Sequence, residues 1–258
     1  NVISGNGGGM VFQAASGSTV QGNYIGTDVT GTRGLSIEAM GISISDGNHL
    51  IGGTAPGAGN VISGNRVGIQ VSTSGPQGNT IQGNLIGLNA LGTGAVPNLS
   101  EGIAISDSMN NIIGGLQSGA ANKIAFNGGR GIGVFFGSRN AIRGNSIFSN
   151  GGLGIDLGGD GLTLNDTTDS DTGANLLQNF PVLTSVQSSG GSTTIQGSLK
   201  STPSTTFQID FYSSAALDPS AHGEGALFFN TTPVTTDGNG DATINVTFPV
   251  TLPVGRAI

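Results

Sequence analysis

Three sequence blocks recur in a fixed order along this chain of 258 residues. The blocks recur about every 61 residues, as from 19 to 80 and from 80 to 141. A chain with such a repeat is restricted to repeat architectures, in which each unit buries its apolar face against the next one. The copies are NVISGN at 1–6 and 60–65 with NKIAFN at 122–127, then TVQGNYIG at 19–26 with TIQGNLIG at 80–87 and AIRGNSIF at 141–148, and GISISDGNHLIGG at 41–53 with GIAISDSMNNIIGG at 102–115.

Apolar residues alternate with small or polar ones inside the blocks, as at Ile42, Ser43 and Ile44. This period of two is typical of strands, and no segment keeps the i, i+3, i+4 spacing of a helix. Gly accounts for 48 residues, and Gly-Asn, Ser-Gly and Asp-Gly pairs tolerate the positive φ angles of sharp bends. We therefore expect a parallel β-helix of about five coils, two per period and roughly 30 residues each. The predicted coil starts are near Gly9, Gly68 and Gly131 for one coil, and near Gly41 and Gly102 for the other.

The Asn residues of the Gly-Asn pairs are expected to stack at equivalent bends. Side-chain amides both donate and accept hydrogen bonds, so stacked Asn residues can satisfy one another along a column. We expect these residues to be structural and to carry no chemistry. The two predicted columns are Asn6, Asn65 and Asn127, and Asn23, Asn84 and Asn145.

The motifs NVISGN, TIQGNLIG and GIAISD resemble the repeats of the right-handed parallel β-helix family found in secreted bacterial proteins. The resemblance covers about residues 1–158 and implies an extracellular or cell-surface location. It does not imply one function, because the same scaffold carries pectin and alginate enzymes, phage tailspikes, adhesins and other surface proteins.

The repeat stops after Gly158, and residues 159–179 form a polar stretch that we interpret as a connector or cap. Longer alternating strands follow over 180–258, which predicts an antiparallel β-sandwich. The segments FQIDFYSS, HGEGALFF and VTTDGNGDATINV are similar to the Ig-like module that often follows β-helix repeats in secreted bacterial proteins. The final LPVGRAI falls where a last strand is expected, so the sandwich is either truncated or continued by further chain.

Composition and charge exclude several classes of partner. Charged residues make up 9% of the chain and the net charge is −7, so we expect no nucleic-acid partner. The chain has no Cys, which excludes disulfides and thiolate metal sites. It has no apolar run of about 18 residues that would predict a membrane span.

Four cations form the candidate glycan-binding set, namely Lys123, Arg130, Arg139 and Arg143. A small cationic patch would suit an acidic sugar, and the alternative is solvated surface charge. The polygalacturonase set of paired Asp, Gly-His-Gly and Arg-x-Lys is absent, and so is the Asp-Pro-His-Asp element of the mannuronan epimerases. We therefore predict no catalytic residue. His49 is replaced by Asn111 one period later, which predicts an exposed loop side chain without a partner.

The connector holds a candidate metal site at Asp166, Asp169 and Asp171, followed by Gly173. Closely spaced carboxylates beside a Gly suit Ca²⁺, which takes six to eight oxygen ligands. The alternative is a solvated polar loop, and no other cofactor is predicted. A similar but weaker group lies at 237–241, where Asp-Gly and Asn-Gly between strands instead predict a hairpin turn.

Two hypotheses of function follow. The first is a non-enzymatic structural or adhesive module of a larger cell-surface or filament-forming protein, whose open rod ends associate end to end. The alternative is a polysaccharide-binding or lyase-like β-helix protein that acts on acidic glycans.

Overall fold

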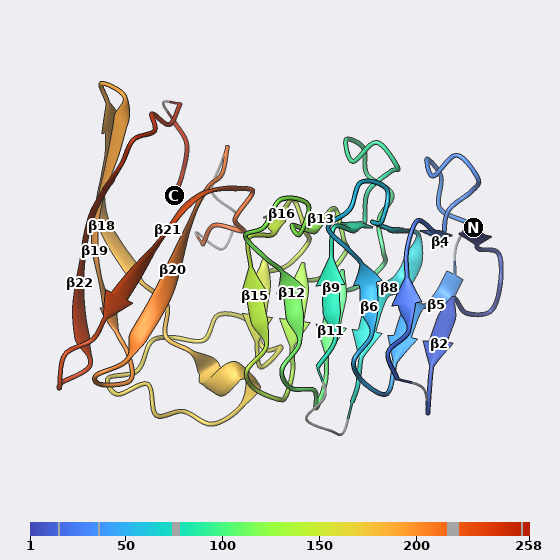
Figure 1. Ribbon diagram of the computed structural model, residues 1–258, viewed down its shortest axis with the longest axis horizontal. Helices are drawn as coiled ribbons and strands as arrows, with labels where there is room; N and C mark the ends of the chain where they lie inside the picture. The colour runs from blue at the N-terminus through green and yellow to red at the C-terminus, as the bar shows by residue number, and fades with distance from the viewer. Residues whose placement is uncertain (15, 36, 74–77, 216–221, 254) are drawn as a thin grey trace.

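The computed structural model describes every residue except 15, 36, 74–77, 216–221 and 254. The chain is all-β, and its strands form two regions that follow one another along the long axis (Figure 1). Three parallel sheets build a β-helix from the N-terminal end, and antiparallel sheets follow at the C-terminal end. The predicted β-helix of about five coils with an antiparallel β-sandwich is therefore confirmed at the level of fold class.

The three sheets of the rod are formed by short strands that belong to successive coils. The first sheet has the order β1 (Val2–Ile3), β4 (Tyr24–Ile25), β7 (Val61–Ile62), β10 (Leu85–Ile86), β13 (Lys123–Ala125) and β16 (Ser146–Phe148). The second sheet runs through β2 (Met10–Phe12), β5 (Ile37–Ile44), β8 (Asn65–Val71), β11 (Ile103–Ile105), β14 (Ile132–Val134) and β17 (Ile155–Leu157). The third sheet contains β3 (Thr19–Val20), β6 (Leu50–Gly52), β9 (Thr80–Gln82), β12 (Ile112–Gly114) and β15 (Ala141–Arg143).

The register of the second sheet confirms two coils in each repeat period. Ile42 pairs with Met10 on one side and Ile69 on the other, and the pairing continues through Ile103 and Ile132. Each Gly that we predicted as a coil start lies directly before one of these paired residues. Homologous blocks are therefore separated by one intervening coil.

The interior of the rod is a stack of β-branched residues that fit a pleated surface. Each sheet contributes a column of fully or almost fully buried Ile, and burial of one such side chain contributes about 1.5–3 kcal/mol. The three columns are Ile25, Ile62, Ile86, Ile124 and Ile147 from the first sheet, Ile42, Ile69, Ile103 and Ile132 from the second, and Ile51, Ile81 and Ile113 from the third.

Glycine is required where the chain leaves the third sheet. Gly52 and its repeat counterpart Gly114 have φ angles of 85° and 83°, a region that side chains other than Gly rarely adopt. A Cβ atom at Gly52 would lie 1.9 Å from the carbonyl oxygen of Gln82 in the next coil. The close approach of consecutive coils therefore excludes a side chain at this bend.

The connector covers part of the C-terminal end of the rod. After β17 the chain runs to a short 3₁₀ helix, η1 (Ala174–Leu177), where Ala174 is buried and Leu177 packs on the apolar interior. Within the described part of the chain, no helix has the length and apolar character needed to cross a membrane.

The C-terminal region is sandwich-like. One sheet contains β18 (Val182–Ser189), β19 (Ser192–Lys200) and β22 (Asp241–Phe248), and the other contains β20 (Thr206–Ser213) and β21 (Leu227–Thr235). The two sheets share an apolar cluster around Phe211 and Phe248, whose ring centroids lie 5.3 Å apart. The predicted hairpin turn at 237–241 is wrong, because this segment joins β21 to a strand that pairs with β19 in the other sheet.

Candidate functional site at the junction of rod and sandwich

Ladders of Asn side chains run along the corners of the rod. In the first ladder, each Asn directly precedes a strand of the first sheet and donates from both its backbone N–H and its side-chain amide to the Oδ1 atom of the next Asn. For Asn60 and Asn84 these two distances are 3.0 and 2.9 Å. The ladder consists of Asn1, Asn23, Asn60, Asn84, Asn122 and Asn145, with Asn1 joined through its side chain.

Two further ladders follow the same geometry and end outside the rod. The second ladder contains Asn65, Asn98, Asn127 and Asn150, and the backbone and side-chain N–H groups of Asn150 donate to Oε1 of Glu224 at 3.1 and 3.0 Å. The third ladder contains Asn79, Asn111 and Asn140, and the Asn140 backbone N–H donates to Oδ1 of Asn175 in η1 at 2.9 Å. The connector and the sandwich thus supply the last acceptors of these two ladders.

The structure places additional Asn residues between the members of the predicted Asn columns and leaves Asn6 outside them. Asn23, Asn84 and Asn145 share one ladder, but Asn60 and Asn122 lie between them. Asn65 and Asn127 share another, with Asn98 between them. Asn6 is exposed and, among the described residues, forms no hydrogen bond with the Asn65 ladder. The sequence signal that we missed is the pattern Asn-x-Ile, which marks the first corner of every coil.

The expectation of an exposed His49 without a partner is wrong. His49 is 1% exposed, its Nδ1 atom accepts a hydrogen bond from the Ser18 backbone N–H at 3.2 Å, and its Nε2 atom lies 2.7 Å from Asp46. Its own backbone N–H donates to Oδ1 of Asn79. His49 therefore occupies the first position of the third ladder, where a ring nitrogen replaces the amide oxygen of Asn.

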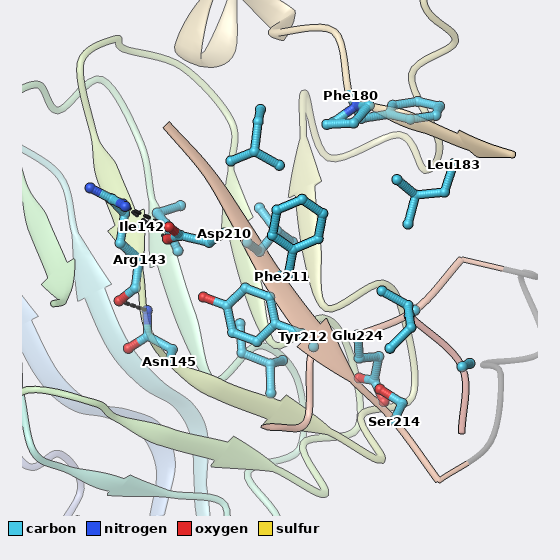
Figure 2. Close-up of a pocket in the computed structure, with 18 of the residues that line it drawn as sticks. Ile142, Arg143, Asn145, Phe180, Leu183, Asp210, Phe211, Tyr212, Ser214 and Glu224 are labelled. Carbon is cyan, nitrogen blue, oxygen red and sulfur yellow. Dashed lines mark hydrogen bonds and ion pairs between the residues drawn. The ribbon is translucent and has the colours of Figure 1, made fainter. Parts of the chain in front are cut away.

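Arg143 links the last coil to the sandwich through a two-point ion pair. Its Nε and Nη2 atoms donate to the Asp210 carboxylate at 2.9 and 2.5 Å (Figure 2). The Nη2 atom also donates to the Thr231 hydroxyl at 3.2 Å. The hydrogen bond that Arg143 donates to Asp210 outweighs partial burial and raises the pKa of Arg143 above its usual value. Arg143 thus stays charged, and its planar guanidinium suits a carboxylate held in this way.

Tyr212 reinforces the same contact. Its hydroxyl accepts a hydrogen bond from the Gly144 backbone N–H at 2.8 Å. Burial, together with the nearby Asp210 carboxylate, raises the pKa of Tyr212 to about 12. The hydroxyl is therefore protonated at neutral pH. A backbone hydrogen bond also crosses the junction: the Ile147 N–H donates to the Gly225 carbonyl at 3.1 Å.

A cavity of about 520 Å³ lies between the last coil and the sandwich. Its walls come from both regions, with Ile142 on the rod side and Phe180, Leu183 and Phe211 on the other side (Figure 2). Ile155 also lines the cavity from the rod. Pockets of about 300–1,000 Å³ at the boundary between two modules are typical ligand sites. This junction is therefore the best candidate for a functional site in the described part of the chain.

The structure does not bring the four predicted glycan-binding cations together. Lys123 lies on the first sheet, Arg130 borders the second and Arg143 lies on the third, while Arg139 is an exposed loop residue between β14 and β15. Lys123 also donates to the Gly92 carbonyl and lies over the Phe148 ring. These positions leave glycan binding by a single cationic patch without support from the geometry.

Arg130 is held in a network along the second sheet. It donates to Asp156 at 2.5 Å, to Glu101 at 3.1 Å and to the Gly159 carbonyl, and its guanidinium lies over the Phe135 ring. Burial disfavours the charged form of Glu101, but hydrogen bonds from Ser100 and Arg130 outweigh it and hold its pKa below the usual 4.5. Arg130 therefore ties three successive coils together near the C-terminal end of the rod.

The connector carboxylates accept hydrogen bonds from protein groups. Asp166 accepts from the Asp169 backbone N–H at 2.5 Å, and Asp169 accepts from the Asn179 backbone N–H at 2.9 Å and from the Ser201 hydroxyl. Asp171 is partly buried and lies in the same loop. In the regions that the structure describes, no group of three His, Cys, Asp or Glu side chains is arranged to hold a metal ion. Asp166 thus acts as an acceptor within the connector, and Asp169 joins the connector to Ser201 of the sandwich.

Neither protein-family models nor curated protein sequences give a match to this chain. The residues that form the junction, Asp210, Tyr212 and Glu224, were not among our predicted site residues. They lie at least 67 residues from their partners along the chain, and no local motif marks them.

Proposed function

We propose that this chain is a non-enzymatic structural module of a larger extracellular or cell-surface protein, in which the sandwich is fixed at a set orientation on a stiff rod. The finer resemblance to right-handed β-helix repeats followed by an Ig-like module is part of this proposal. The observation that carries it is the continuity of the Asn ladders, two of which end on Asn175 and Glu224 beyond the rod.

The contacts at the junction favour a rigid connection over a hinge. Flexibly linked modules have few contacts across their boundary, whereas here Arg143, Tyr212 and Glu224 each form hydrogen bonds across it. The bidentate pair also fixes the orientation of both partners. A rod and sandwich held in this way would present partners at a constant distance and angle.

The sandwich covers strand β16 at the C-terminal end of the rod, which limits end-to-end association there. The last strand of the first sheet is engaged by the sandwich, because Ser146 donates to the Ala226 carbonyl at 2.6 Å and the Ile147 N–H donates to Gly225. Another copy could stack on this end only after displacing the sandwich. Association of the module into filaments would therefore use its other surfaces.

Rigidity can be tested by distance measurements between spin labels, because the chain has no Cys of its own. Ser118→Cys on the rod and Thr243→Cys on the sandwich give the pair across the junction, and Ser118→Cys with Val11→Cys gives a matched pair within the rod; all three sites are exposed. We expect equally narrow distance distributions for both pairs by pulsed electron resonance. A distribution across the junction that is several times broader than the control would refute a fixed orientation.

The absence of enzymatic action is tested separately. The whole chain is incubated with pectate, alginate and glycosaminoglycans while absorbance of unsaturated products and sedimentation with the polymer are followed. We expect neither product nor binding. Product formation that is lost in Arg143→Ala would contradict the proposal and favour the alternative of a lyase-like protein acting on acidic glycans.

A further inference from the structure

The apolar interior of the rod opens into the junction cavity. Ile142 and Ile155 occupy the same register positions as Ile113 and Ile132, which are fully buried in the preceding coil. Ile155 is nevertheless 41% exposed, because no further coil covers it. Phe180, Pro181 and Leu183 face it from the start of the sandwich. The cavity therefore has apolar walls on two sides that protein atoms leave uncovered.

The charged groups of the cavity wall are already engaged with protein partners. The Arg143 guanidinium is neutralised by Asp210, and the Glu224 carboxylate accepts two N–H groups from Asn150. An ionic ligand would have to compete with these pairs, and burial of its own charge would be unfavourable. The wall thus selects against charged molecules.

One polar group of the wall keeps a proton to donate. The Tyr212 hydroxyl accepts from Gly144, but among the described residues its own proton meets no acceptor. Figure 2 shows the Tyr212 ring beside Phe211 with its hydroxyl directed toward the last coil. Tyr212 is partly buried, and an acceptor on a ligand in the cavity would give its O–H group a hydrogen bond shielded from water.

We propose that the junction cavity binds a small, uncharged, mainly apolar molecule with a single hydrogen-bond acceptor, to which Tyr212 donates. The apolar body of the ligand covers Ile155, Phe180 and Leu183, and its carbonyl or ether oxygen faces the Tyr212 hydroxyl. Binding at this position completes the burial of the last coil and ties the sandwich more firmly to the rod. This binding activity goes beyond the structural role proposed above.

Two matched probes test the proposal on the whole chain. 2-Acetylnaphthalene carries one carbonyl acceptor, and 2-ethylnaphthalene has nearly the same shape without it. Binding is measured by equilibrium dialysis with each probe quantified after extraction, so the readout does not depend on the fluorescence of the protein or of its Trp variants. We expect both probes to bind once per chain, with the ketone about five- to tenfold tighter because of one additional hydrogen bond. Tyr212→Phe should abolish the preference for the ketone and leave binding of 2-ethylnaphthalene nearly unchanged.

Variants that fill the cavity test its location. Ile155→Trp and, independently, Leu183→Trp should weaken binding of both probes at least tenfold, whereas Leu164→Trp, at a site that is 74% exposed and outside the cavity wall, should not. A thermal melt establishes that each variant is folded, and the second filling variant serves if the first one is not. The proposal is overturned if the probes show no saturable binding, if both filling variants bind like Leu164→Trp, or if Tyr212→Phe keeps the preference for the ketone.

Discussion

Removal of one Asn from the middle of a ladder tests how much these side chains stabilise the rod. Asn84 is fully buried, and its Oδ1 atom accepts from the backbone N–H and the side-chain amide of Asn60 at 3.0 and 2.9 Å. In Asn84→Ala, these two buried donors lose their acceptor. At about 1–3 kcal/mol for each stranded group, the expected loss is about 2–6 kcal/mol of unfolding free energy. This is a large share of the about 5–15 kcal/mol that stabilises a typical domain.

Urea unfolding followed by circular dichroism measures this loss. With a slope of about 3 kcal/mol per molar urea, the midpoint should fall by about 0.7–2 M while the slope itself is retained. Asn6→Ala is the matched control, because Asn6 is exposed and should change stability by less than about 0.5 kcal/mol. Asn65→Ala is an intermediate case: Asn65 stands at the start of its ladder and its Oδ1 atom has no donor, so its truncation strands no N–H group through that atom. If Asn84→Ala unfolds at the wild-type midpoint, or Asn65→Ala loses as much stability as Asn84→Ala, the ladder argument is refuted.

Three other predictions concern the ladder start, the coil network and the junction. His49→Asn should retain more stability than His49→Ala in thermal melts, because an amide oxygen can replace the ring nitrogen as acceptor; equal losses would contradict this. The lowered pKa of Glu101 means that its ionisation stabilises the fold above the usual pKa of 4.5 and that this contribution is lost as the pH falls through the folded value. Glu101→Gln should therefore melt below wild type at neutral pH, and the difference should shrink in acid; a constant difference between pH 7 and 3 would exclude this origin. Asp210→Asn should lower the unfolding free energy by about 1–3 kcal/mol and separate the melting of sandwich and rod, whereas an unchanged single transition would show that its pair with Arg143 does not couple them.

The architecture of the rod could be predicted because its determinants are local and periodic. Alternating Ile residues and a recurring block order indicate stacked strands without knowledge of any distant contact. The same period does not reveal the ladder members that lie in the intervening coils. Blocks one period apart are two coils apart, so Asn60 was not recognised as the neighbour of both Asn23 and Asn84.

The pairing of the sandwich strands could not be predicted because no local sequence signal determines it. The turn at 237–240 has the composition of a hairpin, and Asp237 does accept backbone N–H groups within it. Its flanking strands nevertheless belong to different sheets, since β22 pairs with β19 over eight residue pairs. The pairing of β22 with β19 rather than β21 therefore reflects packing across the whole sandwich, which the residues of the turn do not encode.

The direction of the hydrogen bonds explains why a carboxylate suits the end of the second ladder. Along every ladder the N–H groups of one Asn donate toward the C-terminal end, so the last Asn presents donors and the first presents an acceptor. A buried donor without a partner is rarer in proteins than an under-used carbonyl oxygen, so the C-terminal end has the stronger need for a cap. Glu224 meets that need for Asn150, because a carboxylate only accepts and therefore ends the series without creating a new donor. An Asn at the same place would accept the two N–H groups but would need an acceptor for its own amide; Asn175, which ends the third ladder, meets this need by donating back to the Asn140 carbonyl at 2.8 Å.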